Sequence, residues 1–306
     1  MSRRELVDRR VLGAVRFVSR VTGLPVEGPL QVSTTPEATA PDEANARLVK
    51  VRPNRQGLHV VFAAPGFEDY CHTFLESELA DVTPPAIDVR LRVTDLSDRF
   101  LPRDFVFRVP RDLAVVTTPL DVPLYPTVQA SQADGWAVLR VRVERELATP
   151  VADPPLRAPV PGALIRVLQP GPAATLLGSG VTEWRQEMSA PRANIGEGLV
   201  VVANIPLLRW STTAGGSVLD PDQVVLFEVR FDSLFDPAAG LVAQRDRRND
   251  PIPNLSALES FVGPGGPGEP IKSRAVSGSG TFSLRARDRR QVTYIFNSDL
   301  TAARRE

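Results

Sequence analysis

The sequence predicts a mainly β protein made of two tandem antiparallel β-sandwich domains followed by a carboxy-terminal β-hairpin. Short valine-rich runs are separated by many of the 29 prolines and 21 glycines in the chain. Proline breaks helices and cannot donate to a strand ladder, so this spacing favours short strands joined by turns. Helix patterns are scarce, and two short motifs recur in the same order in both halves of the chain.

The first half of the chain carries six expected strands. Residues 87–94, IDVRLRVT, show the pattern most clearly, because apolar and polar side chains alternate without interruption. Alternation with a period of two places one face of a strand in a core and the other in water. The expected strands are residues 11–19, 30–33, 47–51, 58–63, 87–94 and 105–109.

A proline-spaced stretch, LAVVTTPLDVPLYPTVQ, follows the sixth strand and is typical of a linker. The predicted domains are therefore residues 1–112 and 133–306, with the linker at 113–132. Expected strands in the second domain are residues 136–143, 164–168, 199–203 and 224–231, and short helices are expected at 76–80 and 254–261. GTFSLRAR and QVTYIFN indicate a closing hairpin, which either completes the second domain or pairs with another chain.

An internal repeat supports the two-domain interpretation. GLHVVFAAP at 57–65 aligns without gaps with GLVVVANIP at 198–206, and PVEGPLQV at 25–32 parallels PVPGALIRV at 159–167. A valine-rich strand precedes each member of the second pair. Matches in the same order predict a duplicated domain.

The order of these motifs resembles that of transthyretin-like, carboxypeptidase regulatory-like β-sandwich domains. The matching pieces are a strand, a Pro-Val-x-Gly turn into a second strand, and a Gly-Leu-x-Val strand that ends in proline. The second copy departs from the pattern, because Leu207 stands where the first copy has Gly66 after its proline. The resemblance implies seven-stranded, non-catalytic domains that bind or brace other proteins. The tandem arrangement is also similar to accessory components of phage-tail-like contractile injection systems.

Charge and composition exclude several classes of function. The 36 basic and 36 acidic side chains balance, so no net field attracts nucleic acid or anionic lipid. No apolar run approaches the roughly 20 residues of a membrane span, and one cysteine excludes an intrachain disulfide. The amino terminus lacks the apolar core of a signal peptide. We expect a cytoplasmic protein, or one that leaves the cell within a particle.

The segment GLHVVFAAPGFEDYCHTF, residues 57–74, holds both histidines and the single cysteine. If Pro65 and Gly66 form the centre of a hairpin turn, His59 lies opposite His72, with Cβ atoms roughly 5 Å apart. Two imidazoles at that separation can share a metal, but zinc needs three or four ligands, and Cys71 points to the opposite face. A one-residue slip of the turn would also separate the histidines.

The repeat argues against a metal site at this position. The counterpart of His59 in the second half is Val200, so packing is sufficient there. We predict no metal and no cofactor, with His59 and His72 as the only weak candidates for metal ligands. Nucleophilic catalysis would need one of the same two histidines, and no phosphate or calcium loop is present, so the sequence predicts no enzyme.

Tryptophans offer a different kind of site. Trp184 and Trp210 lie in the second half and could form a platform for a sugar ring, although large aromatic side chains are more often buried. The arginines of the alternating strands are expected on solvated faces, where they could also contact carboxylates of a partner. These arginines are Arg90, Arg92, Arg140 and Arg142.

The function predicted from the sequence is that of a non-catalytic structural or adaptor protein within a multi-subunit assembly. Its partners are expected to be proteins, including further copies of the same chain, which contact the edge strands and the terminal hairpin. The alternative is a protein that binds carbohydrate or another surface ligand through its tryptophans.

Overall fold

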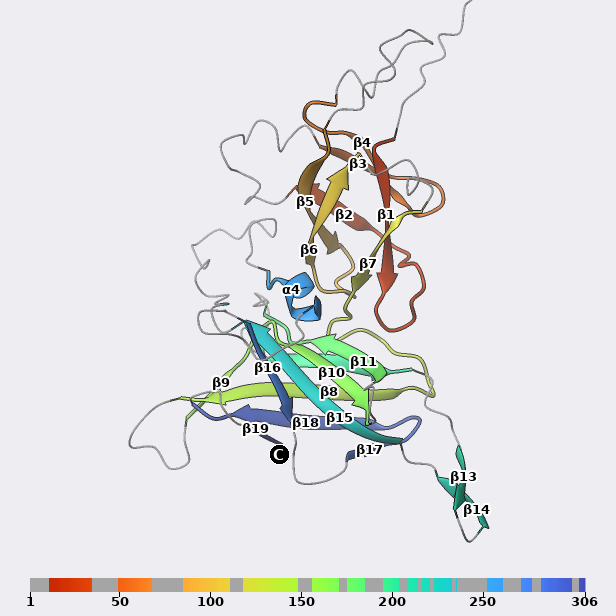
Figure 1. Ribbon diagram of the computed structural model, residues 1–306, viewed down its shortest axis with the longest axis vertical. Helices are drawn as coiled ribbons and strands as arrows, with labels where there is room; N and C mark the ends of the chain where they lie inside the picture. Colours follow the sequence, from red (N-terminus) through yellow and green to blue (C-terminus); the bar gives the residue numbers. More distant parts are fainter. Residues whose placement is uncertain are drawn as a thin grey trace, which may run out of the picture.

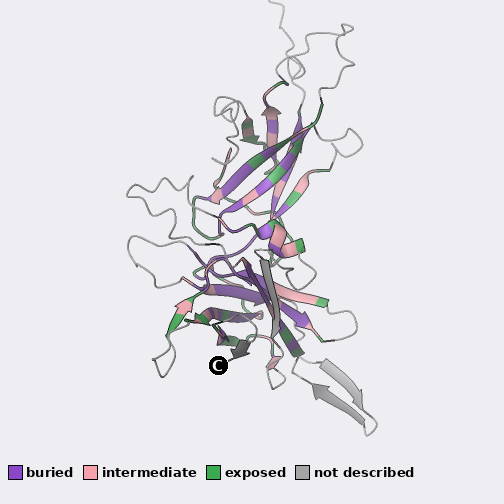
Figure 2. Cartoon of the chain, turned by 60° about the vertical axis from the view of Figure 1, so that its left-hand side comes forward, coloured by how far each residue is buried: buried purple, intermediate pink, exposed green. Residues whose placement is uncertain are grey.

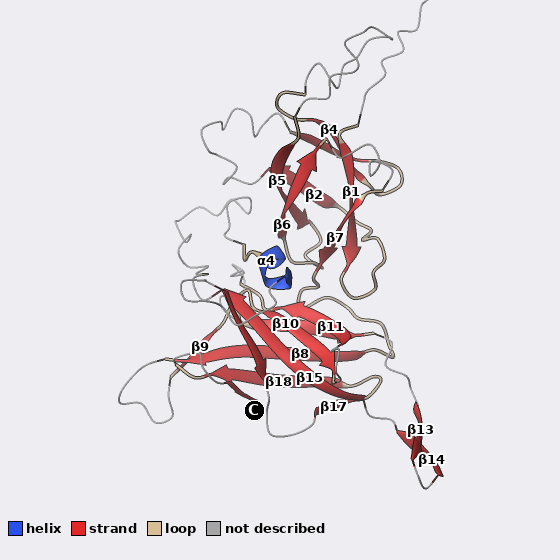
Figure 3. Ribbon diagram, viewed as in Figure 1, coloured by secondary structure: helices blue, strands red, loops and turns tan. Residues whose placement is uncertain are grey.

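A computed structural model gives the fold of the chain, and the part of the chain that it describes is mainly β, as predicted. Figure 1 and Figure 3 show two groups of strands, with the short helix α4 (Leu255–Ser260) between them. We call these groups the N-terminal unit and the C-terminal unit. The described residues are 11–34, 49–67, 85–110, 118–147, 156–170, 175–184, 195–203, 209–213, 216–220, 223–232, 235, 252–260, 271–276, 282–298 and 303–305.

The N-terminal unit consists of two sheets that share one hydrophobic core. One sheet has the order β3-β4-β1-β7 and the other has the order β2-β5-β6. Alternate residues of β5 and β6 are buried between the sheets, because one face of each strand is apolar. The strands are β1 (Gly13–Ser19), β2 (Leu30–Thr34), β3 (Lys50–Pro53), β4 (His59–Ala63), β5 (Ile87–Asp95), β6 (Arg103–Val109) and β7 (Leu120–Leu124).

Strand β7 corrects the predicted linker at 113–132. It pairs in parallel with β1, and Val122 and Leu124 are buried in the core of the N-terminal unit. Pro123 misled the prediction, since proline is rare within a sheet. Proline is tolerated here because, within the described residues, β7 has a paired neighbour on one side only. The N-terminal unit therefore extends at least to residue 124.

The C-terminal unit also has two sheets around one core. One sheet has the order β12-β8-β18-β19 with β9 beside β8, and the other has the order β11-β10-β15-β16 with β17 beside β15. Strands β13 (Arg209–Thr213) and β14 (Gly216–Asp220) pair with each other and form a hairpin that projects from this unit in Figure 1. The remaining strands are β8 (Ala137–Glu146), β9 (Arg157–Pro159), β10 (Leu164–Gln169), β11 (Thr175–Val181), β12 (Glu197–Val202), β15 (Gln223–Asp232), β16 (Ile271–Val276), β17 (Phe282–Leu284), β18 (Arg289–Phe296) and β19 (Ala303–Arg305).

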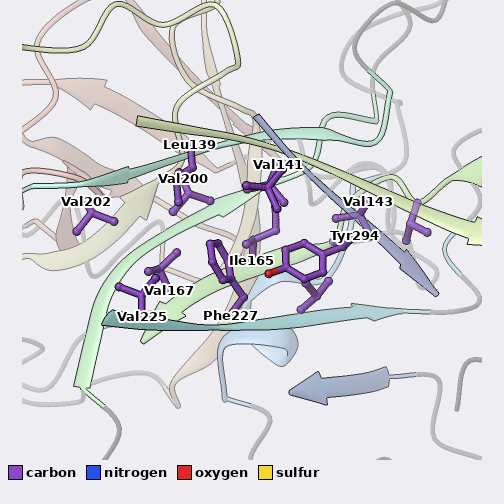
Figure 4. Close-up of a cluster of buried hydrophobic side chains, with 14 of the residues drawn as sticks. Leu139, Val141, Val143, Ile165, Val167, Val200, Val202, Val225, Phe227 and Tyr294 are labelled. Atoms are coloured by element: carbon purple, nitrogen blue, oxygen red, sulfur yellow. The ribbon is translucent and has the colours of Figure 1, made fainter. Parts of the chain in front are cut away.

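Branched aliphatic side chains fill the core of the C-terminal unit. Figure 4 shows Val141 of β8 and Ile165 of β10 between the two sheets, with the rings of Phe227 and Tyr294 beside them. The centroids of these two rings lie 5.4 Å apart. Figure 2 shows the same separation of buried and exposed faces along the strands of both units. Burial of the apolar faces is the main favourable contribution to folding.

The expected carboxy-terminal hairpin is not formed by its two strands. β17 pairs with β15, whereas β18 pairs in parallel with β8 in the opposite sheet. Asp288 accepts a hydrogen bond from the Arg285 backbone N–H at 2.9 Å, so a turn is present as predicted. Local turn residues specify the change of direction, but they do not specify which sheet receives the next strand. Tyr294 and Phe296 of β18 are buried and complete the core of the C-terminal unit.

The strand pairings of the two units correspond in the way that the sequence repeat suggests. β1 pairs antiparallel with β4 and parallel with β7, and β8 pairs antiparallel with β12 and parallel with β18. In both Pro-Val-x-Gly turns the valine N–H donates to the first strand at 2.8 Å, from Val26 to Phe17 and from Val160 to Val143. One strand differs, since β3 pairs with β4 whereas β11 pairs with β10.

Glycines allow β11 and β12 to approach closely at the edges of the two C-terminal sheets. A Cβ atom on Gly178 would lie 2.5 Å from the Val201 carbonyl oxygen, and one on Gly198 would lie 2.9 Å from the Val181 carbonyl oxygen. Gly180 would meet the carbonyl oxygen of Leu199 in the same way. These contacts involve backbone atoms, which cannot rotate away as a side chain can. The glycine spacing in β11 therefore allows the two sheets to meet along this edge.

We predict that Gly180→Ala lowers the free energy of unfolding by about 2 kcal/mol, because the added methyl group forces two backbones apart. Urea unfolding of the purified chain measures this change. Thr175→Ala, at an exposed position of the same strand, is the matched control and should change stability by less than about 0.5 kcal/mol. Equal stability of Gly180→Ala and the unchanged chain would contradict the close approach of β11 and β12.

Candidate functional site at the junction of the two units

Helix α4 lies at the junction and contacts β6 of the N-terminal unit together with β10 and β15 of the C-terminal unit. The Asn254 side chain accepts a hydrogen bond from the Ala257 backbone N–H at 3.1 Å, which caps the start of the helix. This helix corresponds to the one expected at 254–261. Seven buried side chains from both units and α4 form one apolar cluster: Leu101, Tyr125, Leu164, Val181, Trp184, Leu255 and Leu258.

The carboxylate of Glu259 on α4 is bound by two residues of the N-terminal unit. Arg103 at the start of β6 donates from Nη2 to Oε2 at 2.6 Å and from Nη1 to Oε1 at 2.9 Å. The hydroxyl of Tyr125 donates to Oε1 at 2.6 Å. Arg103 Nη1 also donates to the carbonyl oxygen of Pro123 at 3.0 Å. Two parallel bonds between a guanidinium and a carboxylate are both strong and directional.

Burial and charge keep these groups in the protonation states that the hydrogen bonds require. Burial raises the pKa of Glu259, but the hydrogen bond and positive charge of Arg103, together with the Tyr125 hydroxyl, bring it below its ordinary value. Burial is also the largest effect on Tyr125, and with the negative charge of Glu259 it raises the pKa of the hydroxyl far above its usual range. At neutral pH Glu259 is therefore ionised and Tyr125 is protonated.

A second arginine binds the carboxy-terminal end of α4. Arg230 of β15 donates from Nη1 to the carbonyl oxygens of Leu258 at 3.0 Å and Glu259 at 3.2 Å. These carbonyls have no partner within the helix, and a cation at this end also opposes the helix dipole. Glu228 orients Arg230 by accepting from its Nε at 2.6 Å, and accepts from Arg166 at 2.8 Å. The helix is thus held on both sides by arginine.

The two units also contact each other beside the helix. The Val128 backbone N–H donates to Glu183 Oε1 at 2.8 Å, and Arg20 Nε donates to Ser179 Oγ at 3.1 Å. A second apolar cluster accompanies these bonds, and it joins side chains of β8, of β12 and of the chain that follows β7. Val21 of the N-terminal unit packs against this cluster. Its buried members are Val128, Val138, Leu199 and Val201. The connecting chain is therefore bound by both units, since Thr127 forms a backbone hydrogen bond with Arg99 and Val128 donates to Glu183.

This arrangement of charges is suited to holding the two units together. Three donors occupy the carboxylate of Glu259, and the Arg103 side chain is only 5 % exposed. A carboxylate in this state is a poor proton acceptor, because its ionised form is already stabilised by its partners. Removal of one partner would leave a buried charge unpaired, which is the costly case. The junction therefore stabilises one relative orientation of the units.

The sequence did not single out Arg103, Tyr125 or Glu259. Each belongs to a segment with an ordinary local pattern, and the three are brought together only when β6, the end of β7 and α4 meet. Arg92 also differs from expectation, since its residue surface is 4 % exposed and its guanidinium binds Asp104 at 2.7 and 2.8 Å. Arg90 and Arg140 are exposed, as a solvated face requires.

His59 lies in the core of the N-terminal unit rather than at an open site. It is 6 % exposed, and its ring packs edge-on against Phe17 with 4.9 Å between centroids. Desolvation lowers the pKa of the imidazole, and a hydrogen bond with the Leu30 backbone offsets part of this effect. The neutral ring therefore behaves mainly as an aromatic core residue.

The register of β4 sets the cross-strand neighbours of His59. His59 pairs with Val15 of β1 on one side and with Pro53 of β3 on the other. Both edges of β4 are occupied at this position, so no further strand can pair with it there. His72 and Cys71 lie outside the described residues. Among the described residues, no group of three or more His, Cys, Asp or Glu could hold a metal ion.

Trp184 is 3 % exposed and packs edge-on against Phe235, with 6.4 Å between the ring centroids. It contributes to the apolar cluster at the junction, so neither face of its ring is open to a flat sugar in this conformation. Trp210 belongs to β13, and its side chain is outside the described part of the chain.

No protein family, curated protein or solved structure that was compared matches this chain. Within the described residues, none of the helical structure has the length and apolar character needed to cross a bilayer. The function must therefore be inferred from the geometry of the junction and of the strands.

We predict that Glu259→Gln destabilises the chain by roughly 3 kcal/mol, because it leaves the buried Arg103 without a counter-charge. Chemical denaturation followed by circular dichroism measures the loss. The control is Asp121→Asn, which removes the carboxylate of the Arg16–Asp121 pair at a similar 2.7 Å distance, but in a pair whose side chains are 38 % and 49 % exposed. Its effect should be much smaller, since solvent screens exposed pairs. Equal effects of the two substitutions would contradict a special role for the junction.

We predict that His59 makes stability depend on pH in weakly acidic solution. Its pKa is lowered from 6.5 in the fold, so the unfolded chain binds more protons as the pH falls below that value. The contribution of His59 to the free energy of unfolding is therefore fully present above pH 6.5. It decreases as the pH falls toward the lower pKa that His59 has in the folded chain. Urea midpoints between pH 8 and 5 should show this slope in the unchanged chain and a flatter slope in His59→Val. His72→Gln is the control, and an unaltered slope in His59→Val would exclude this assignment.

Proposed function

We propose that this chain is a non-catalytic structural or adaptor protein that joins other proteins within a larger assembly. The observation that carries the proposal is the junction, where a bidentate Arg103–Glu259 pair, the Tyr125 hydroxyl and a buried apolar cluster hold two β-rich units in one orientation. A protein that holds its partners in fixed positions needs a fixed distance and angle between its own two units. Flexible linkers between domains do not provide these.

Within the described residues, the N-terminal unit has sheet edges with no paired strand, and these edges supply the surfaces for such partners. The outer strands of its two sheets present backbone groups that another chain's strand can pair with, and this mode of recognition is common. In the C-terminal unit, β11 lies against β12 and β16 lies beside β19, which leaves less edge available. The two units therefore suit different tasks, with the N-terminal unit better placed for strand addition.

We further propose that both units are transthyretin-like sandwiches and that the assembly is a phage-tail-like contractile injection particle. The matching Pro-Val-x-Gly contacts and the parallel pairing of the first strand of each unit, β1 with β7 and β8 with β18, support a duplicated domain. The assignment of the particle rests only on the similarity between the tandem domain arrangement and accessory components of such particles. Carbohydrate binding, the alternative, is not favoured, because Trp184 is used in the junction.

We expect the chain to sediment with a large particle in a gently prepared lysate of its source organism. A tagged chain at its native level should appear in fractions far heavier than its own 33.3 kDa, and mass spectrometry of those fractions should identify the other components. Glu259→Gln should reduce incorporation, whereas Asp121→Asn should be incorporated normally. A chain that sediments as a monomer or dimer in the lysate would contradict the proposed function.

A further inference from the structure

Strand β6 is the last strand of the sheet β2-β5-β6, and in the described part of the chain no strand pairs with its outer edge. Its register with β5 is unbroken over all seven residues, from Ile87 opposite Val109 to Val93 opposite Arg103. The side chains of β6 alternate between buried and more exposed positions along its whole length. It is therefore a long, regular edge strand of the kind that readily pairs with another strand.

Two of the other edge strands of the N-terminal unit carry features that oppose pairing, and the remaining one, β2, is shorter than β6, with five residues. β3 contains Lys50 and Pro53 and has an irregular register beside Lys50, and β7 contains Pro123. Charged residues, prolines and bulges are the usual protections of edge strands. β6 has no proline and no bulge, and its charged residues are of both signs, Asp104 as well as Arg103 and Arg108. Its outward face instead carries Val106, which is 53 % exposed.

The outward residues of β6 are complementary to themselves when the strand is reversed. Asp104, Val106 and Arg108 alternate with buried residues and share one face of the sheet. In an antiparallel pair centred on Val106, Asp104 of each strand lies opposite Arg108 of the other, and the two valines lie opposite each other. Opposite charges and apolar pairs directly across from one another stabilise antiparallel strands.

We propose that β6 pairs antiparallel with β6 of a second copy of this chain, centred on Val106, so that the two sheets join into one continuous sheet. This inference rests on the proposed function and specifies one of its contacts. A two-fold axis through Val106 uses the same surface on both copies, as closed dimers require. An unrelated strand would have no need of this symmetric pattern of charges, which is why a second copy is the occupant that fits.

The charges of β5 extend the pattern across the joined sheet. Asp104 already binds Arg92 on β5, and its side chain remains 35 % exposed. Each carboxylate oxygen can accept a further bond, so Asp104 can bind Arg108 of the second copy without losing Arg92. Arg108 pairs across from Asp88 on its other side. Acidic and basic side chains would therefore alternate across four neighbouring strands.

The test uses two substitutions at Val106 and sedimentation of the purified full chain. The unchanged chain should form a dimer, whereas Val106→Lys and Val106→Asp should each raise the dimer dissociation constant about tenfold or more, because like charges face each other. An equimolar mixture of the two variants should dimerise again, since lysine then faces aspartate. Val224→Lys, the same change at a valine that is 37 % exposed on β15, should dimerise like the unchanged chain.

Recovery of the dimer in the mixture supports pairing at Val106, because a loss of folding in either variant could not be repaired by mixing. The pairing is overturned if the unchanged chain is monomeric, or if both variants dimerise as tightly as the unchanged chain. A chain that is monomeric alone but sediments with a particle in the lysate overturns only this inference. A dimer in pure solution with no particle in the lysate overturns the proposed function and keeps the pairing.

Discussion

The ion pair between Arg103 and Glu259 is the interaction on which the arrangement of the whole molecule depends. Arg103 begins β6 of the N-terminal unit, and Glu259 lies on a helix that follows β15 of the C-terminal unit. A charge as deeply buried as Arg103 must have a partner. The carboxylate, the Tyr125 hydroxyl and the apolar cluster around α4 are satisfied together in this orientation of the two units. The requirement to neutralise one buried guanidinium thus stabilises a specific geometry between the units.

The two units share a pattern of strand pairing but differ at their edges. In each unit the first strand has one antiparallel and one parallel neighbour. β1 pairs antiparallel with β4 and parallel with β7, and β8 pairs antiparallel with β12 and parallel with β18. In the C-terminal unit β11, which precedes β12 in the chain, belongs to the other sheet, where Gly178 and Gly180 let it lie against β12. In the described part of the N-terminal unit β3 pairs with β4, and no strand pairs with the outer edge of β6.

Much of the secondary structure could be predicted, because alternation of apolar and polar residues is a local property of a strand. The strand at 87–94 and the short helix after Asn254 illustrate this, since each needs only a few neighbouring residues to form. Predictions failed where the partner of a segment decided its structure. β7 was taken for a linker because Pro123 suggested irregular chain, and parallel pairing with β1, about 100 residues earlier, leaves no local signal. Arg92 looked solvated until Asp104 on the neighbouring strand provided its counter-charge.

The sequence by itself determined a mainly β chain in which two short motifs recur in the same order. Valine-rich alternation and turn residues act over short distances, so they can be recognised without the fold. The sequence also determined that any histidine or cysteine chemistry is restricted to two histidines and one cysteine, all within residues 57–74. Only the tertiary structure decided that His59 is a core residue with β1 and β3 on either side, that β18 joins the sheet opposite β17, and that Arg103 meets Glu259. These outcomes depend on which distant segments become neighbours, and that choice is made by the packing of the whole core.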